Sequence, residues 1–288
     1  MASETENEIL SAWETSSQYW TKHQSLIEEM FAPLTRALIE AAHIGRPRGF
    51  GQSVLDIGGG SGEPSLTLSQ MMGASGSVTF TDPSAGMVKA AQEESQRRGL
   101  ANIQFHQCPA QKLPFADNSF DVAVSRLAAM FIPNPLAGFC EVLRVIRPGA
   151  RVSLLVWGPR AVNPFFSVVT DVLNGFVPAD EEDEDAPAAF RFARAGKLAT
   201  LLEEAGATSV TERTLPFRIE APINIHQFFE LRTEMSDTFR SKLATLSSEE
   251  VKSVRKAVEK AVATYFESGS MSFPAEALIV TGRKEGED

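Results

Sequence analysis

The 288-residue chain has an ordinary globular composition, with 43% hydrophobic and 22% charged residues. Its formal net charge of −10 argues against nucleic-acid binding, which depends on lysine and arginine clustered at phosphates. The polar first ten residues do not resemble a signal peptide, and no apolar run is long enough to span a bilayer, so we expect a cytoplasmic protein without membrane attachment.

Cysteine and histidine usage gives no sign of a disulfide or a metal centre. Cys108 and Cys140 lie far apart, each inside an expected element, which is typical of buried thiols in a reducing compartment. The four histidines and two cysteines have no metal-ligand spacing, so no metal is expected.

The N-terminal segment, residues 7 to 43, is expected to form two helices, because its apolar residues recur every three or four positions. Pro33 suggests a kink or a new helix start near Ala32. The stretch from Gly45 to Gly51 reads as a loop.

The next stretch, residues 53 to 64, is the most informative part of the chain. A short apolar strand over 53–57 precedes glycines at alternate positions, Gly58, Gly60 and Gly62, and Pro64 fits the first turn of a helix. A strand, a glycine turn and a helix N-terminus together form a cradle for a nucleotide or cofactor, although a tight turn without a ligand has the same pattern.

Strands and helices then alternate as in parallel βαβ units. After the strand at 53–57, helices are expected at 63–72, 84–98 and 135–146, and strands at 77–81, 102–107, 120–125 and 151–157. Residues 158–196 interrupt this rhythm with an apolar helix ending at Phe176 and an acidic run, Glu181 to Asp185, that reads as a solvated loop.

The C-terminal part is expected to contain a helix at 195–205, a strand at 208–219, two amphipathic helices within 223–268 and a last strand at 277–282. Ser247 or Ser248 is suited to cap the second of those two helices. No linker is long enough to separate two domains, so a single domain is expected.

Two acidic residues refine the kind of ligand. Asp82 lies twenty residues beyond Gly62 at the end of a strand, where a carboxylate can accept both hydroxyls of a ribose. Asp56 lies two residues before Gly58, the first glycine, where it disfavours a pyrophosphate and favours a cationic amino-acid moiety.

Five segments in this order resemble the motifs of class I S-adenosylmethionine-dependent methyltransferases, most closely the ubiquinone/menaquinone-biosynthesis-like branch that acts on small molecules. They are residues 56–62, 82–87, 113–121, 143–151 and 156–159, and residues 274–283 resemble that branch's last strand. The resemblance implies an α/β, Rossmann-like, doubly wound sheet of seven mostly parallel strands with an antiparallel last strand. Within one domain, 1–288, it implies an N-terminal helical lid (1–50), a cofactor-binding core (51–157) and substrate-cap insertions with the last strands (158–288).

S-adenosyl-L-methionine is the cofactor that the resemblance implies. The residues expected to bind it are Asp56, Gly58, Gly59, Gly60, Gly62, Asp82, Pro83, Met87, Ala110, Gln111, Ser125 and Arg126. The glycine backbone would hold the methionine part, Asp82 the ribose, and Met87 either the adenine or the helix core. Arg126 would pair with the cofactor carboxylate, pair with Asp56, or make a structural ion pair.

The loop after the third strand departs from the family pattern. Cys108-Pro109-Ala110-Gln111 stands where Gly-Asp-Ala-Glu is usual, so Pro109 replaces the acid that binds the adenine amino group. Proline offers neither a side-chain acceptor nor a backbone donor there.

The acceptor side is less defined. Tyr19, Trp20, Met130 and Phe131 are expected to contact the acceptor, or else to be core, and His23 and His226 are the candidate general bases, although a structural role is the more expected one for each. The expected function is methyl transfer to an O, N or C nucleophile of a small, largely apolar acceptor. Two alternatives stay open: a cyclisation or rearrangement without methyl transfer, supported by Pro109, and a non-catalytic cofactor-binding regulator. Either a monomer or a homodimer is compatible with the sequence.

Overall fold

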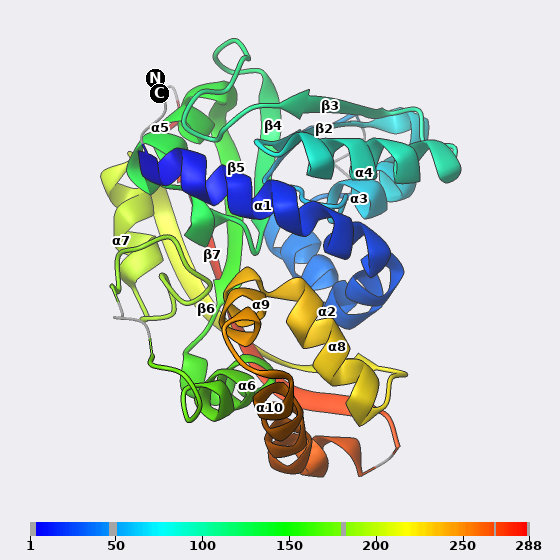
Figure 1. Cartoon of the computed structure of the whole chain (residues 1–288). Coiled ribbons are helices and arrows are strands. Elements are labelled where there is room, and N and C mark those ends of the chain that lie inside the picture. The colour runs from blue at the N-terminus through cyan, green and yellow to red at the C-terminus, as the bar shows by residue number, and fades with distance from the viewer. Residues whose placement is uncertain (1–3, 46–50, 180–182, 268, 287–288) are drawn as a thin grey trace.

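A single seven-stranded sheet organises the computed structural model, which describes residues 4–45, 51–179, 183–267 and 269–286 (Figure 1). Its order is β3-β2-β1-β4-β5-β7-β6, and only β7 runs antiparallel to its neighbours. The strands are β1 (Ser53–Ile57), β2 (Ser77–Asp82), β3 (Ile103–Gln107), β4 (Phe120–Arg126), β5 (Ile146–Trp157), β6 (Ala207–Ala221) and β7 (Met271–Lys284). The predicted fold class, with its antiparallel last strand, is confirmed.

Helices flank this sheet and follow the predicted alternation. They are α1 (Glu4–Lys22), α2 (Gln24–Ala42), α3 (Ser65–Met72), α4 (Ala85–Arg97), α5 (Pro135–Val145), α6 (Pro164–Leu173), α7 (Lys197–Glu204), α8 (Ile225–Met235), α9 (Asp237–Ala244) and α10 (Ser248–Val262). Short 3-10 turns occur at 73–75, 129–131, 160–162 and 263–266. The expected loop at 45–51 and the expected acidic run lie partly outside the described residues.

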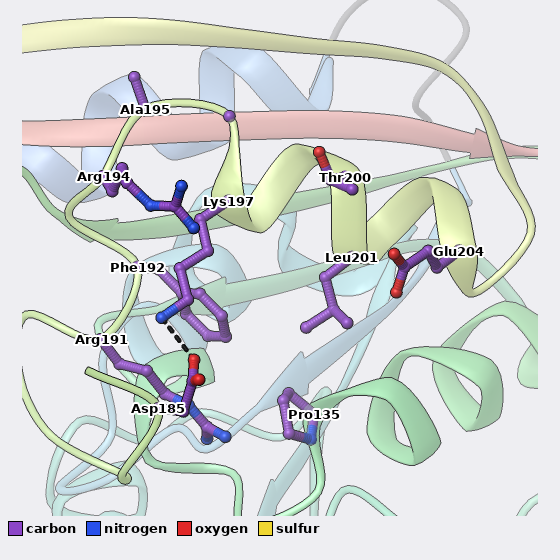
Figure 2. A pocket seen from close by; sticks show the side chains of 11 residues that line it. Pro135, Asp185, Arg191, Phe192, Arg194, Ala195, Lys197, Thr200, Leu201 and Glu204 are labelled. Atoms are coloured by element: carbon purple, nitrogen blue, oxygen red, sulfur yellow. Dashed lines mark ion pairs between the residues drawn. The ribbon is translucent and has the colours of Figure 1, made fainter. Parts of the chain in front are cut away.

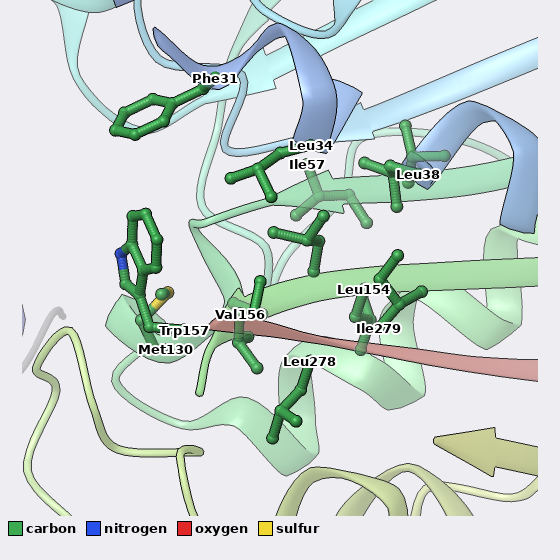
Figure 3. Packing of buried hydrophobic residues seen from close by; sticks show 14 of the residues in the cluster. Phe31, Leu34, Leu38, Ile57, Met130, Leu154, Val156, Trp157, Leu278 and Ile279 are labelled. Atoms are coloured by element: carbon green, nitrogen blue, oxygen red, sulfur yellow. The ribbon is translucent and has the colours of Figure 1, made fainter. Parts of the chain in front are cut away.

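The break between the first two helices is at His23, so no new helix starts near Ala32, one of the two predicted options. Pro33 lies inside α2, which stays helical because its apolar face packs on the sheet. Figure 3 shows Leu34 and Leu38 over the strand residues of the core, and the ring of Phe31 lies 5.6 Å from that of Trp157. Packing of this face outweighs the loss of one helical hydrogen bond.

β6 and β7 form a ribbon that is longer than predicted, paired from Ala207 with Lys284 to Ala221 with Met271. The sequence pattern missed the first part of β7 because Pro274 lies within it, and proline usually marks the end of a strand. Met271 and Phe273 are nevertheless buried, and they belong to the same continuous core as the rest of the sheet.

This end of the ribbon is covered by a helical cap, which we define as α6, α8, α9 and α10 (Figure 1). Phenylalanines dominate it: the ring of Phe273 is stacked 5.1 Å from that of Phe228, and Phe165 packs edge-on against both. Three helices, not the predicted two, occupy 223–268, because Ser236 caps an additional one by accepting from the backbone N–H of Phe239. Ser247 caps α10, as one of the two predicted options.

Candidate functional site

The turn between β1 and α3 is tied to the neighbouring strand by its backbone. The N–H groups of Gly58 and Gly59 both donate to the carbonyl of Thr81, at 2.9 and 3.0 Å. Gly60 has φ +55°, and a Cβ placed on it would meet no atom within 4 Å. A Cβ on Gly62 would lie 2.4 Å from Leu66, so this glycine serves helix packing. Gly60 is therefore the point where the turn faces open space.

Asp82, at the end of β2, closes the same turn from the other side. Its Oδ2 accepts from the N–H of Gly60 at 3.0 Å, and its Oδ1 accepts from the N–H of Ser84 at 2.9 Å. Burial raises the pKa of the carboxyl to about 6, against the two hydrogen bonds that lower it. Each oxygen retains a lone pair for a further donor.

Asp56 lies beneath the turn and is fully buried. Its Oδ2 accepts from the Ser65 hydroxyl at 2.6 Å, whereas its Oδ1 has no hydrogen-bond partner. Burial raises the pKa of Asp56 to about 7, opposed by the Ser65 bond and by the charge of Arg126. A buried carboxylate with an unpaired oxygen favours positive charge nearby.

Arg126, the last residue of β4, brings a partly buried cation to the same place. Its side chain donates to the Thr35 hydroxyl of α2 at 2.7 Å, and its Nε has no partner. Its charge is offset mainly by Glu63 and Asp56, yet no ion pair within 4 Å joins Arg126 to either in the described chain. The predicted direct pair with Asp56 is thus not present in this conformation.

The remaining expected cofactor residues differ in their hydrogen bonds and in their burial. The Ser125 hydroxyl donates to the carbonyl of Ile57 at 2.9 Å, and the Pro83 carbonyl accepts from a neighbouring side chain. Met87 is only 2% exposed within α4, and Ala110 is also buried. Gln111 donates to Glu6 of α1 at 3.2 Å, which places the loop containing Pro109 beside the N-terminal helix.

Helix α1 crosses this edge of the sheet and contacts α4 (Figure 1). Glu14 accepts from the N–H groups of Ala85 and Gly86 at 2.6 and 3.0 Å, which satisfies the first turn of α4. A Cβ on Gly86 would lie 2.4 Å from the Ser17 hydroxyl, so the two helices are in close contact. Sequence reasoning missed Glu14, because nothing local marks an acid that reaches a helix seventy residues away.

Aromatic side chains line the inner side of α1. The Trp13 ring packs edge-on against Phe131 at 5.0 Å and against Trp20 at 5.8 Å. The indole N–H of Trp20 is buried without a partner, whereas Tyr19 faces the guanidinium of Arg240 at 4.6 Å. Met130, in contrast, is fully buried and lies beside Trp157 in the core (Figure 3).

The two candidate bases have different surroundings. His23 is half-buried at the junction of α1 and α2, and its Nε2 lies 2.5 Å from a carboxylate oxygen of Glu234 on α8, which also pairs with Lys22. His226 is exposed and pairs with Glu259 of α10 at 2.7 Å. Of these two histidines, His23 is therefore the one that joins the N-terminal helices to the cap.

A surface cavity of about 570 Å³ lies elsewhere, between the start of α5, the loop before α7 and α7 itself (Figure 2). None of the expected cofactor or acceptor residues lines it. Its Lys197 pairs with Asp185 at 2.7 Å, and Arg191 donates to a backbone carbonyl, so these two cations are internally satisfied.

The described residues form neither a metal site nor a membrane-spanning helix. They contain no cluster of three or more His, Cys, Asp or Glu side chains that could hold a metal. Nor does any helix in the described ranges have the length and apolar character to cross a bilayer.

Comparisons with known proteins agree with this geometry. A family model described as a methyltransferase domain matches residues 55–154. An uncharacterized protein of Mycobacterium tuberculosis is 28% identical over 227 residues, 78% of each chain. A ubiquinone/menaquinone biosynthesis C-methyltransferase of Azotobacter vinelandii is 38% identical over 106 residues, but this covers only 36% of the present chain and 42% of the relative. The solved YcgJ protein from Bacillus subtilis has a similar fold, with a TM-score of 0.55 at 19% identity over 88% of this chain and 98% of that one.

Proposed function

Because the chain belongs to the class I S-adenosylmethionine-dependent methyltransferases, we propose that it transfers a methyl group to an O, N or C nucleophile of a small, largely apolar acceptor. The observation that carries this proposal is the turn at Gly60. It faces open space and is hydrogen-bonded to Asp82, an acid placed for a ribose. A cytoplasmic location and the oligomeric state stay predictions.

The residues of the site fit the cofactor. Asp82 has an unused lone pair on each carboxylate oxygen, which suits the two ribose hydroxyls. The unpaired Oδ1 of Asp56 and the unpaired Nε of Arg126 supply one buried group of each sign, which matches the ammonium and carboxylate of an amino-acid moiety. Asp56 would act at the base of the turn, because it is fully buried there.

The cofactor, when bound, supplies an electrophilic methyl group on a sulfonium. The protein's contribution is mainly to align the acceptor and exclude water, and such positioning supplies roughly 7–11 kcal/mol of the barrier. In this proposal α1 serves as a lid, which is held by Glu14 and by His23, the residue that follows the helix. Trp20 and Phe131 form an apolar wall for the acceptor.

A proton must leave an acceptor such as a phenol or alcohol. His23 is the base that we propose, because Glu234 bonds its Nε2 and thereby favours the tautomer in which Nδ1 is free to accept a proton. His226 has no such place in this proposal, since its imidazole is exposed and paired on the outer side of the cap.

One observation favours a second candidate function, a cyclisation or rearrangement without methyl transfer. Pro109 occupies the position of the usual adenine-binding acid, next to Cys108, whose N–H donates to the carbonyl of Asp82. A site that has lost this contact would hold the cofactor less tightly, and catalysis of ring closure does not consume the methyl group.

The test is methyl transfer from S-adenosylmethionine labelled in the methyl group, over a panel of phenols, amines and quinone-like carbon acids. The proposal expects label in at least one acceptor and formation of S-adenosylhomocysteine. Cofactor binding in calorimetry without transfer to any acceptor would favour the second candidate. No binding at all would contradict both.

A further inference from the structure

Arg232 is a buried cation on α8 for which the cap provides no counter-charge. The residue is 6% exposed, and its Nε has no hydrogen-bond partner. Across residues 4–45, 51–179, 183–267 and 269–286, no hydrogen bond or ion pair to the side chain of Arg232 is found. Burial alone lowers the pKa of its guanidinium to about 10. Burial of an unpaired charge is unfavourable, so a partner from outside the chain is expected.

Two other shielded arginines are paired with acids, and the charge of Arg126 is offset by Glu63 and Asp56 nearby. Arg98 bonds Glu28 and Glu94, and Arg240 bonds Asp237 at 2.8 Å. Arg232 differs because its surroundings are aromatic.

The guanidinium of Arg232 lies over two rings of α6, 4.7 Å from the centroid of Phe165 and 4.9 Å from that of Phe166. These cation–π contacts orient the group and offset part of the cost of burying it. They leave the five N–H donors of the guanidinium unused, and those donors match a carboxylate through two parallel hydrogen bonds.

The place of Arg232 relates it to the methyl-transfer site. Phe166 packs edge-on at 4.8 Å against Trp157, the last residue of β5, and ligands of such sheets bind beyond the carboxyl ends of the strands. Two residues farther along α8, Glu234 bonds His23. Arg232 is therefore in the part of the cap that adjoins this edge of the sheet.

We propose that Arg232 recognises a carboxylate on the acceptor, so that the substrate is an apolar molecule with one acidic group. The inference rests on the proposed function, because it identifies the acceptor of that same site. A single guanidinium in an aromatic wall matches a monoanion in charge, whereas a phosphate dianion would leave one negative charge unpaired.

The experiment measures binding of acid and amide pairs by calorimetry with S-adenosylhomocysteine present: benzoate with benzamide, cinnamate with cinnamamide, and hexanoate with hexanamide. We expect the acid of at least one pair to bind at least tenfold more tightly than its amide. Arg232→Met should reduce this preference to below twofold, and Arg232→Lys should retain part of it. Equal binding of acid and amide in every pair, no binding of any, or a preference that survives in Arg232→Met would overturn the proposal.

Arg255→Met is the matched control, because Arg255 makes the same kind of contact with Phe229, at 4.8 Å, but its side chain is 41% exposed and lies 3.7 Å from Glu230. This variant should keep the preference. Arg232→Met should melt no lower than the wild type, since it removes an unpaired charge, and a clear loss of melting temperature would indicate a structural role instead. Titration with S-adenosylhomocysteine alone separates the two claims: its failure contradicts the proposed function, whereas its success without acid preference contradicts only the role of Arg232.

Discussion

Gly60→Ala tests whether the open side of the glycine turn receives the cofactor. The new methyl group would meet no protein atom within 4 Å, so the only cost within the free protein is an alanine at φ +55°. A left-handed conformation costs about 1–2 kcal/mol for a residue with a Cβ, which corresponds to a fall in melting temperature of about 2–8 °C. With the cofactor bound, the methyl group would enter occupied space, and such overpacking costs typically about 1–3 kcal/mol, or a 5- to 150-fold loss of affinity.

Gly99→Ala is the control that isolates this effect. Gly99 also has a positive φ, +68°, and its Cβ would also meet nothing within 4 Å, but it follows the C-terminal end of α4, away from the turn. Both variants should lose similar stability in thermal melts, and only Gly60→Ala should lose affinity for S-adenosylhomocysteine in calorimetry. Equal affinity of the two variants would refute the reasoning that the turn approaches the ligand at Gly60.

Three further predictions follow from the acids and the histidines. Asp82→Ala removes the two charge-assisted hydrogen bonds that the ribose hydroxyls would donate to its carboxylate, about 1.5–3 kcal/mol each. Cofactor affinity should therefore fall about 10²- to 10⁴-fold in calorimetry, and affinity within threefold of the wild type would exclude the ribose role. The pKa of Asp56 is raised from 3.8 to about 7, so its contribution to stability is full below pH 3.8 and is lost as the pH rises through 7, by up to about 4 kcal/mol. Ligand-free Asp56→Asn should therefore gain melting temperature over the wild type between pH 5 and pH 8, and a pH-independent difference would contradict the buried charge. If His23 is the base, His23→Gln should lower kcat about 10²- to 10⁴-fold with a hydroxyl acceptor. His226→Gln should leave turnover unchanged, and equal turnover of the two variants would remove His23 from the mechanism.

Local pattern predicted the core of the fold well, because the strands up to β5 are short, apolar and separated by helix-length segments. The glycine turn and Asp82 were placed by spacing alone, since both lie at the ends of neighbouring parallel strands. Their mutual hydrogen bond, from Gly60 to Asp82, follows from that topology.

Features that depend on distant packing were not predictable. The helix break at His23 has no strong local signal, whereas Pro33 has one and is overridden by the face that α2 buries. Glu14 was missed because its role lies in contacts with α4, and Arg232 because nothing in its helical segment shows that aromatic rings of α6 enclose it.

The most direct test of the central claim is a crystal structure of the complex with S-adenosylhomocysteine. The account predicts the amino-acid end of the ligand against the turn from Gly58 to Gly62 and both ribose hydroxyls on the carboxylate of Asp82. Density for the ligand at any other place, or none at saturating concentration, would contradict it.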